Sequence, residues 1–355
     1  MVLLLFILLL SAIIIVHEFG HLIAAKIFNV YCEEFSMGIG PKVLSYKAKE
    51  TTYSLRLFPM GGFVAMAGDT ENDLETKVTK EVPFERTIKG LAKWKQIVIM
   101  LAGIFMNFVM AFIIVAMVIL NGGFYAKSAD TTLASIVENS PAYHAGLKAN
   151  DKIIYMAYED LGISTKPKTF DDISTFMYGN DALELTLIVE SNGVEKEVVL
   201  VPEYNEIEGR YMIGIGSKQL IPVEVNIYNV WGFAVDYLLY ATRSIIMSLT
   251  HLLRGVGLNN LSGPIGIYQA TSDAVDMGAS SYLLMMGVIS LNVGIFNALP
   301  LPIMDGGRVL ILIIESIIRR PLSDKTINLL MSLSMALILM LFIYVTFQDI
   351  IKLIF

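Results

Sequence analysis

Residues 13–25, IIIVHEFGHLIAA, place a glutamate and two histidines inside a hydrophobic helix. The apolar run around them extends from Val2 to Phe28, which is long enough to cross a hydrocarbon core of about 30 Å. An ionisable side chain at the centre of such a span costs on the order of 2.5–3.5 kcal/mol, so His17, Glu18 and His21 indicate a functional site. The alternative is that the two histidines form only structural hydrogen bonds between helices.

The composition is that of a membrane protein, because 55% of the 355 residues are hydrophobic and 17% are charged. Beside the first run, the stretches long enough to span a bilayer are 96–120, 282–303 and 329–347. The first run lacks a basic n-region, so we expect it to be retained as a span rather than cleaved as a signal peptide. A weaker run, 230–253, carries Asp236 and Arg243 and is expected to be an interfacial amphipathic helix.

Charge predicts the orientation. The segment 26–95 holds 11 Lys and Arg residues, whereas 122–280 holds 10 against 19 Asp and Glu residues. The positive-inside rule therefore places 26–95 and the basic loop 304–325 in the cytosol, and both termini and the acidic segment outside it. The net charge of −7 argues against a nucleic-acid partner. The single cysteine, Cys32, excludes an intrachain disulfide.

We therefore predict an α-helical polytopic membrane protein with four transmembrane helices, a membrane-associated β-hairpin and an inserted α+β domain. The predicted segments are a first span at 1–28, a cytosolic segment at 29–94, a second span at 95–121, the α+β domain at 127–203, an extracytoplasmic or interfacial linker region at 204–280, a third span at 281–306, a cytosolic loop with a short helix at 307–325, and a fourth span at 326–350.

The cytosolic segment contains the expected hairpin, at about 50–66, with Pro59 and Gly61-Gly62 at its turn. Because this stretch is apolar and lies between two spans, we expect it to re-enter the membrane and pack on protein there. The alternative is a hairpin that stays in the cytosol. In the second span, Gly103 permits close helix packing, and Asn107 is a polar side chain at depth that needs a partner.

His17 and His21 are four residues apart, so they share one helix face and can present two imidazole nitrogens to one metal ion. Glu18 lies about 100° round the helix, where it can act as a general base on water at the metal. A zinc site of this kind needs a third protein ligand and an open fourth position. We therefore expect Zn²⁺ as the cofactor.

Asp305 is the candidate third ligand. His17 lies about 24 Å along its helix from Met1, and the third span, which runs in the same direction, brings Asp305 to a similar depth near the cytosolic side. Pro300 and Pro302 are expected to break that helix. Gly306 and Gly307 are expected to end it, and the alternative is that Asp305 only belongs to this helix-ending turn.

Three motifs together resemble the site-2 protease family of intramembrane zinc metalloproteases, in its bacterial RseP-type branch: HEFGH in the first span, GGFV at 61–64 and NALPLPIMDGG at 297–307. The inserted domain, with SPAYHAGLKANDKI at 140–153, looks like a PDZ domain. The resemblance covers nearly the whole chain. Met304 and Ile104 depart from the family pattern, where leucine and proline are usual.

The resemblance implies that His17, His21 and Asp305 ligate zinc and that Glu18 is catalytic. It also implies a part in substrate binding for five residues: Asn292, Asn297, Gly61, Gly62 and Phe63. The PDZ-like domain would either bind a peptide end by strand addition or act as a steric filter.

The predicted function is that of a zinc-dependent intramembrane endopeptidase of the bacterial cytoplasmic membrane. It would cut the transmembrane segments of single-span proteins, such as anti-sigma factors or signal-peptide remnants, after another protease has removed their outer part. Membrane lipid is the other expected partner. The alternative is a zinc-binding membrane scaffold or metal transporter without protease activity, but a transporter should show paired half-repeats, and none is detectable.

Overall fold

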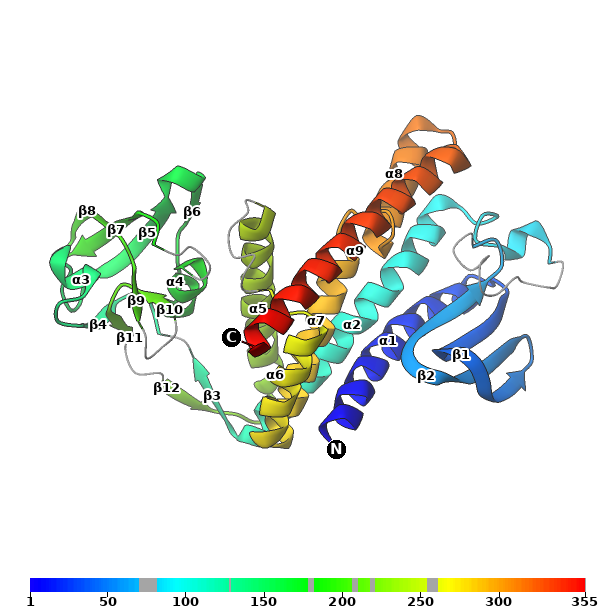
Figure 1. Ribbon diagram of the computed structural model, residues 1–355, viewed down its shortest axis with the longest axis horizontal. Coiled ribbons are helices and arrows are strands. Elements are labelled where there is room, and N and C mark those ends of the chain that lie inside the picture. Colours follow the sequence, from blue (N-terminus) through cyan, green and yellow to red (C-terminus); the bar gives the residue numbers. More distant parts are fainter. Residues whose placement is uncertain are drawn as a thin grey trace. The chain divides into compact units, whose positions relative to one another are not determined.

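Figure 1 shows the computed structural model of the chain, which describes residues 1–69, 82–127, 129–177, 182–205, 210–217, 221–253 and 261–354. The chain forms two compact units. The first combines Met1–Val118 with Ser262–Phe355, and the second is Ile119–Leu261.

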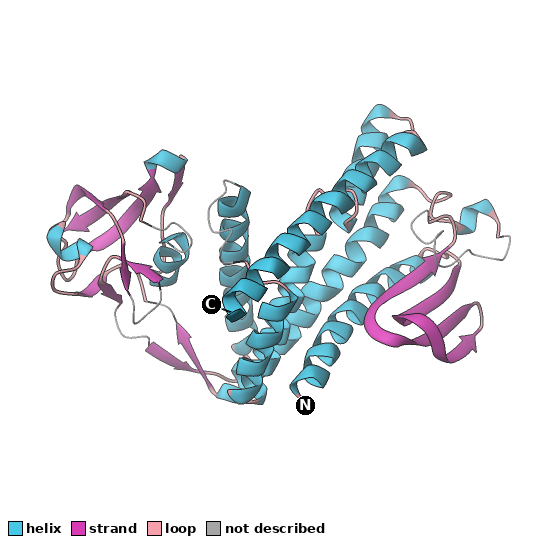
Figure 2. Cartoon of the chain, in the orientation of Figure 1, coloured by secondary structure: helices cyan, strands magenta, loops and turns pink. Residues whose placement is uncertain are grey.

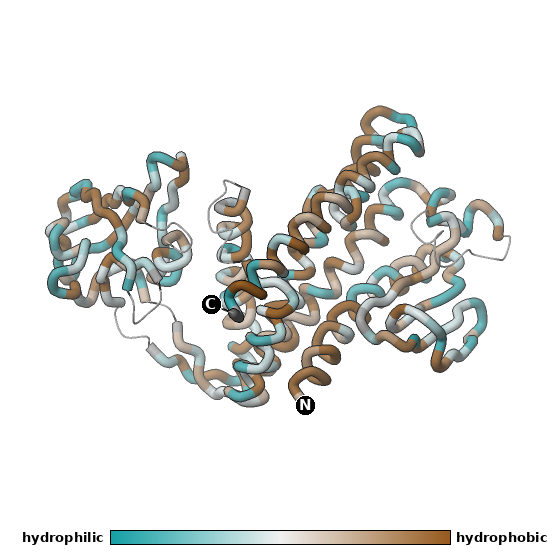
Figure 3. Tube along the Cα trace, viewed as in Figure 1, coloured by the Kyte–Doolittle hydropathy of each residue, from teal (hydrophilic) through white to brown (hydrophobic). Residues whose placement is uncertain are grey.

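The prediction of four membrane-spanning helices is confirmed. The helices long and apolar enough to cross a bilayer are α1 (Val2–Ile27), α2 (Lys93–Gly122), α7 (Ala279–Asn297) and α9 (Asp324–Ile354). The 26 residues of α1 extend over about 39 Å, which exceeds the hydrocarbon thickness. Figure 3 shows the N-terminal part of α1 as strongly hydrophobic. The chain is a multi-pass membrane protein.

The β-hairpin is larger than the sequence predicted. It consists of β1 (Cys32–Ala48) and β2 (Thr51–Met66), which pair antiparallel and appear as the long magenta strands beside α1 in Figure 2. The chain reverses at Lys49, which adopts a left-handed conformation with φ of 51°. The predicted start near residue 50 is therefore too late, because β1, which begins at Cys32, belongs to the same sheet.

The predicted turn at Pro59 and Gly61-Gly62 is confirmed by the strand pairing. Glu34–Met37 pair in parallel with Thr52–Leu55 and antiparallel with Gly62–Ala65, so the chain reverses between these two segments. These residues lie inside β2, in a stretch where the register shifts between the Ile39–Phe58 and Met37–Gly62 pairs. Proline and glycine are tolerated in strands at such irregularities. Pro59, Gly61 and Gly62 therefore lie where β2 changes direction.

An apolar cluster joins the hairpin to α1 and α2. Its buried members include Leu22, Val30, Phe35, Val64 and Ile99. Burying these side chains together fixes the hairpin against the C-terminal half of α1, which carries His17 and His21.

The third span ends earlier than predicted, and Asp305 begins a helix instead of preceding its end. Helix α7 stops at Asn297, residues 298–304 form an irregular connection that contains both prolines, and α8 runs from Asp305 to Ile318. Gly306 and Gly307 lie in the first turn of α8. A Cβ atom on Gly307 would lie 2.0 Å from the carbonyl oxygen of Leu301, so only glycine fits against this connection.

In the second unit, a four-stranded antiparallel sheet in the order β6-β5-β7-β8 forms the centre of an α+β domain. Its strands and helices are β4 (Leu133–Ile136), α3 (Pro141–His144), β5 (Lys152–Tyr158), β6 (Ile163–Thr165), α4 (Phe170–Met177), β7 (Leu185–Ser191) and β8 (Val194–Leu200). Strand β11 (Ile215–Ser217) pairs with β4, and Ile213 is buried in the same core. The domain therefore extends past the predicted boundary at 203.

The predicted linker region 204–280 contains regular structure. The described elements here are β9 (Glu203–Asn205), β10 (Arg210–Met212), β12 (Ile221–Glu224), α5 (Val230–Leu253) and α6 (Pro264–Asp276). Strand β9 pairs with β10, and β12 pairs with β3 (Phe124–Lys127), which precedes the α+β domain. Helix α5 forms as predicted, and it is not among the described helices that are apolar enough to span a membrane. Helix α6 belongs to the first unit, where Asp349 of α9 accepts hydrogen bonds from the backbone N–H groups of Gly263 and Gly266.

Candidate metal centre

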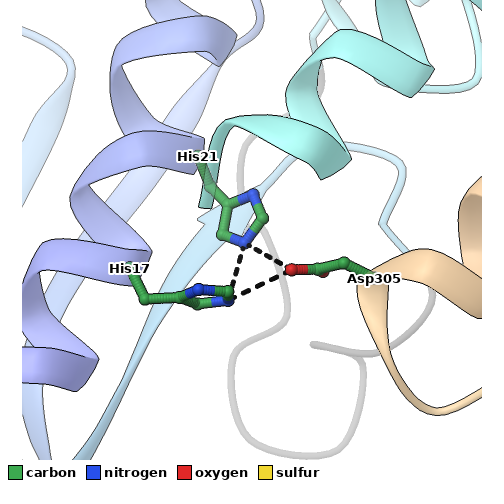
Figure 4. A group of neighbouring side chains, drawn as sticks. All are labelled: His17, His21 and Asp305. Carbon is green, nitrogen blue, oxygen red and sulfur yellow. Dashed lines mark hydrogen bonds and ion pairs between the residues drawn. The ribbon is translucent and has the colours of Figure 1, made fainter. Parts of the chain in front are cut away.

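Three side chains from α1 and α8 converge on one point, as Figure 4 shows. Nε2 of His17 lies 3.1 Å from Oδ2 of Asp305, and Nε2 of His21 lies 3.3 Å from the same oxygen. The two Nε2 atoms are 3.2 Å apart. The helical spacing aligns the histidines, and the connection 298–304 brings Asp305 to them.

This triangle has the dimensions of a zinc site. Ligands held tetrahedrally at 2.0–2.1 Å from zinc are roughly 3.3–3.4 Å from one another. Oδ2 of Asp305 is buried and has no hydrogen-bond donor among the described residues. The distances between the two imidazole nitrogens and the carboxylate oxygen are therefore those expected for three ligands of one cation. The residues fit Zn²⁺.

The opposite nitrogen of each imidazole has a partner on α2. Nδ1 of His21 donates to the carbonyl oxygen of Ile99 at 2.8 Å, which leaves Nε2 of neutral His21 free to bind metal. Nδ1 of His17 lies 3.2 Å from the terminal amide of fully buried Asn107. For His17 to bind metal through Nε2, this amide must accept the Nδ1 proton through its oxygen, which a 180° rotation of the amide allows.

Gly103 of α2 faces the two histidines. A Cβ atom at this position would lie 2.4 Å from Nε2 of His21 and 2.8 Å from Cε1 of His17. The space beside the ligand atoms therefore exists because this residue has no side chain. The sequence marked Gly103 as a helix-packing residue and Asn107 as a polar residue at depth that needs a partner. Only the structure shows that both lie next to the imidazoles.

Glu18 lines a cavity of about 280 Å³ beside the triangle. The other lining residues are His17, His21, Gly62, Phe63, Val64, Met66, Asp69, Met100, Asn297, Ile303, Met304, Asp305 and Arg308. A carboxylate next to two imidazoles and a pocket of this kind is the arrangement of a general base beside a metal. Asp69 and Arg308 carry no signal in the sequence that would have placed them here.

The hairpin follows α1 toward this cavity. Ser11, which is buried in α1, donates a hydrogen bond to the carbonyl oxygen of Pro59. Ser11 lies about 14 Å from the start of α1, so this part of β2 lies beside the middle of a spanning helix. Gly62 approaches so closely that an added Cβ atom would lie 2.9 Å from the carbonyl oxygen of Ser36 and 3.5 Å from Cγ of Glu18.

The residues predicted to bind substrate divide into two groups. Gly62, Phe63 and Asn297 line the cavity, whereas Asn292 and Gly61 are not among the described residues around it. Asn292 is five residues before Asn297 and therefore about 140° away on α7.

Two groups in β1 have shifted pKa values. Burial alone raises the pKa of the Glu34 carboxyl, but hydrogen bonds from Lys42, Ser54 and Arg56 outweigh it and hold this pKa below its ordinary value. The network therefore stabilises the hairpin at neutral pH, and this contribution is lost as the pH falls through the lowered pKa. Burial raises the pKa of the Cys32 thiol to about 11, so this cysteine stays protonated and is not poised as a metal ligand.

The chain is similar to known proteins over almost its whole length. The model of peptidase family M50 matches residues 5–341. A candidate zinc metalloprotease of Clostridium perfringens is 33% identical, over 96% of each chain. The regulator of sigma-W protease RasP of Bacillus subtilis is 27% identical over 97% of each chain, and the zinc metalloprotease RasP of Geobacillus kaustophilus is 27% identical over 98% of this chain and 97% of its own.

Proposed function

The chain belongs to peptidase family M50 and is a membrane zinc metalloprotease, and from this premise we propose that it cuts peptide bonds inside the transmembrane segments of single-span membrane proteins. In this proposal His17, His21 and Asp305 hold the zinc ion, and Glu18 is the catalytic residue.

One observation carries the proposal. The ligand triangle and Glu18 lie on or beside a helix that is apolar enough to span the bilayer, and they line one shared cavity. Hydrolysis needs water and a carbonyl in reach of the same base. A cavity of this kind within the membrane-spanning unit supports hydrolysis of a substrate that is itself in the membrane.

The chemistry follows from the side chains. Bound zinc would polarise the scissile carbonyl and lower the pKa of water to about 7. Glu18 would accept the proton from the attacking water and pass it to the leaving amine. Gly103 keeps the space beside the ligand nitrogens open, while Ile99 and Asn107 hold the two imidazole rings in orientation.

The substrate must present an unpaired backbone. A transmembrane helix has all its amides bonded, and an unsatisfied group in lipid costs several kcal/mol. Gly62 and Phe63 of β2 pair with Met37 and Ser36 of β1, and both line the cavity beside Glu18. We propose that the unwound substrate adds to β2 at Gly62 and Phe63, next to Glu18.

Asn297 and Asn292 provide a test of substrate contact within one helix. We expect Asn297→Ala to lower kcat/KM by about tenfold, because it removes a hydrogen-bonding group from the cavity wall. Asn292→Ala, on another face of α7, should change kcat/KM by less than about twofold. Steady-state cleavage of a membrane-embedded reporter measures both, and equal losses would contradict a specific role for Asn297.

For topology, we propose that both termini and the α+β domain are extracytoplasmic and that the site lies toward the cytosolic side of a bacterial cytoplasmic membrane. The distribution of Lys and Arg supports this orientation. The domain is proposed to be PDZ-like and to admit substrates whose outer part has already been removed. The name of the Bacillus relative links that protein to sigma-W, which makes anti-sigma factors a substrate class to test.

The function is tested with purified protein in liposomes that contain a single-span reporter. We expect a strong chelator to stop cleavage and added Zn²⁺, but not Mg²⁺, to restore it, because the ligand set of two imidazoles and one carboxylate suits zinc. Cleavage that persists after complete zinc removal would contradict the proposal. Uptake of labelled zinc by the same liposomes, without cleavage, would favour a transporter.

A further inference from the structure

The third ligand lies on a helix that must be held in place from outside. Helix α8 begins at Asp305 and is separated from α7 by the irregular connection 298–304. A metal ligand has to be positioned to within about 0.5 Å. Contacts further along α8 must therefore hold Asp305 against the histidines of α1.

Arg308, one turn after Asp305, provides such a contact. Its guanidinium forms an ion pair with the carboxylate of Asp69, which follows the end of β2. The Asp69 side chain is 3% exposed and that of Arg308 is 21% exposed, so the pair is largely shielded from solvent. Removing one partner would take this ion pair away from a largely buried charge.

Asp69 is a firm anchor because its own N–H and the backbone of Ala67 just before it are hydrogen-bonded. Its N–H donates to the carbonyl oxygen of Met66, and the N–H of Ala67 donates to that of Tyr31. The N–H of Ile88 donates to the carbonyl oxygen of Ala67. These bonds tie the residue to the end of β2 and to the segment that leads into α2.

The ion pair also lies where two cavities meet. Asp69 and Arg308 line the 280 Å³ cavity of the metal centre and a neighbouring cavity of about 340 Å³. Farther along α8, Glu315 lines the neighbouring cavity and pairs with Lys93 at the start of α2. Two ion pairs therefore fasten α8, and the one nearer to Asp305 borders the site.

We propose that Asp69 and Arg308 are positioning residues, and that their ion pair is a brace that holds Asp305 in register with His17 and His21. The brace joins β2 to the helix of the third ligand. This inference rests on the proposed function, because β2 is the strand to which substrate would add. Substrate binding and metal-site geometry are then mechanically coupled through one ion pair.

The test compares Asp69→Asn, Arg308→Gln, Arg308→Lys and the double exchange of Asp69→Arg with Arg308→Asp. The readouts are the half-life of bound zinc in excess chelator, the thermal unfolding temperature, and kcat and KM for the reporter. We expect the two neutralising variants to shorten the zinc half-life by about 10- to 100-fold and to lower kcat more than KM changes. Arg308→Lys and the double exchange should recover most of the half-life.

Lys196→Gln is the matched control. Lys196 pairs with Asp151 in the α+β domain, with side-chain exposures of 34% and 3%, so the burial resembles that of the brace. This variant should leave the zinc half-life unchanged. If Arg308→Gln lowers only the unfolding temperature and also leaves the half-life unchanged, the brace is refuted.

If Arg308→Lys folds and still loses zinc as fast as Arg308→Gln, the ion pair is likewise not the positioning element. The zinc half-life is measured without substrate, so it tests the role of the Asp69–Arg308 brace even if no reporter is cleaved. Failure of wild-type protein to cleave would instead count against the proposed function alone.

Discussion

Replacing Glu18 with glutamine should abolish cleavage of a membrane-embedded reporter while the protein keeps its zinc. Glutamine has nearly the same shape but cannot accept the proton of the attacking water, and general-base catalysis contributes about 10²- to 10⁴-fold. Glu18 lies beside the ligand triangle but provides none of its three ligand atoms, so the substitution leaves the metal ligands unchanged.

Single-turnover cleavage measures the loss of activity, and metal analysis of the same preparation measures whether zinc is retained. Glu197→Gln, an exposed substitution in the α+β domain, is the control for the chemical change and should cleave as wild type does. Undiminished cleavage by Glu18→Gln would remove Glu18 from the mechanism. Loss of zinc together with activity would make it a structural residue of the site.

Replacing Gly103 with alanine should empty the metal site. The new methyl group would lie 2.4 Å from Nε2 of His21, well inside van der Waals contact, at the atom that has to face the metal. The substitution itself favours a helix by about 1 kcal/mol, so α2 should not unfold. We expect zinc affinity to fall by about 100-fold or more, the upper end of changes around a metal site, with loss of cleavage.

Gly122→Ala is the control within the same helix, because an added Cβ atom there meets nothing within 4 Å. It should keep zinc and activity. Competition with a chromophoric chelator measures the affinities of both variants. If Gly103→Ala binds zinc as tightly as wild type, the close approach of α2 to the two imidazoles is not a requirement of the site.

The triangle could be predicted from the sequence because its parts follow from simple geometry. Two histidines four residues apart share a helix face, and the depth of Asp305 could be counted along the chain. Gly103 could not be predicted in the same way. Its contribution is the absence of a side chain beside two imidazoles, and that depends on how α1 and α2 pack.

The hairpin and α8 show why local signals failed elsewhere. Pro59 and the two glycines mark the reversal of β2, but this local signal cannot show that the segments before and after it both pair with Glu34–Met37 instead of with each other. The Asp-Gly-Gly run could equally end one helix or begin another. A carboxylate in the first turn is favourable at a helix N-terminus, and the glycines meet the carbonyl oxygens of Ala298 and Leu301, which only the folded structure brings near.

The three ligand atoms come from positions far apart in the sequence, and this has a consequence for biosynthesis. His17 and His21 leave the ribosome roughly 280 residues before Asp305 does. At about 5–20 residues per second, roughly 15–60 s pass while the nascent chain carries only part of its centre. The histidines thus enter the membrane beside other newly inserted helices without a third ligand. The metal centre can be completed only after Asp305 has been synthesised.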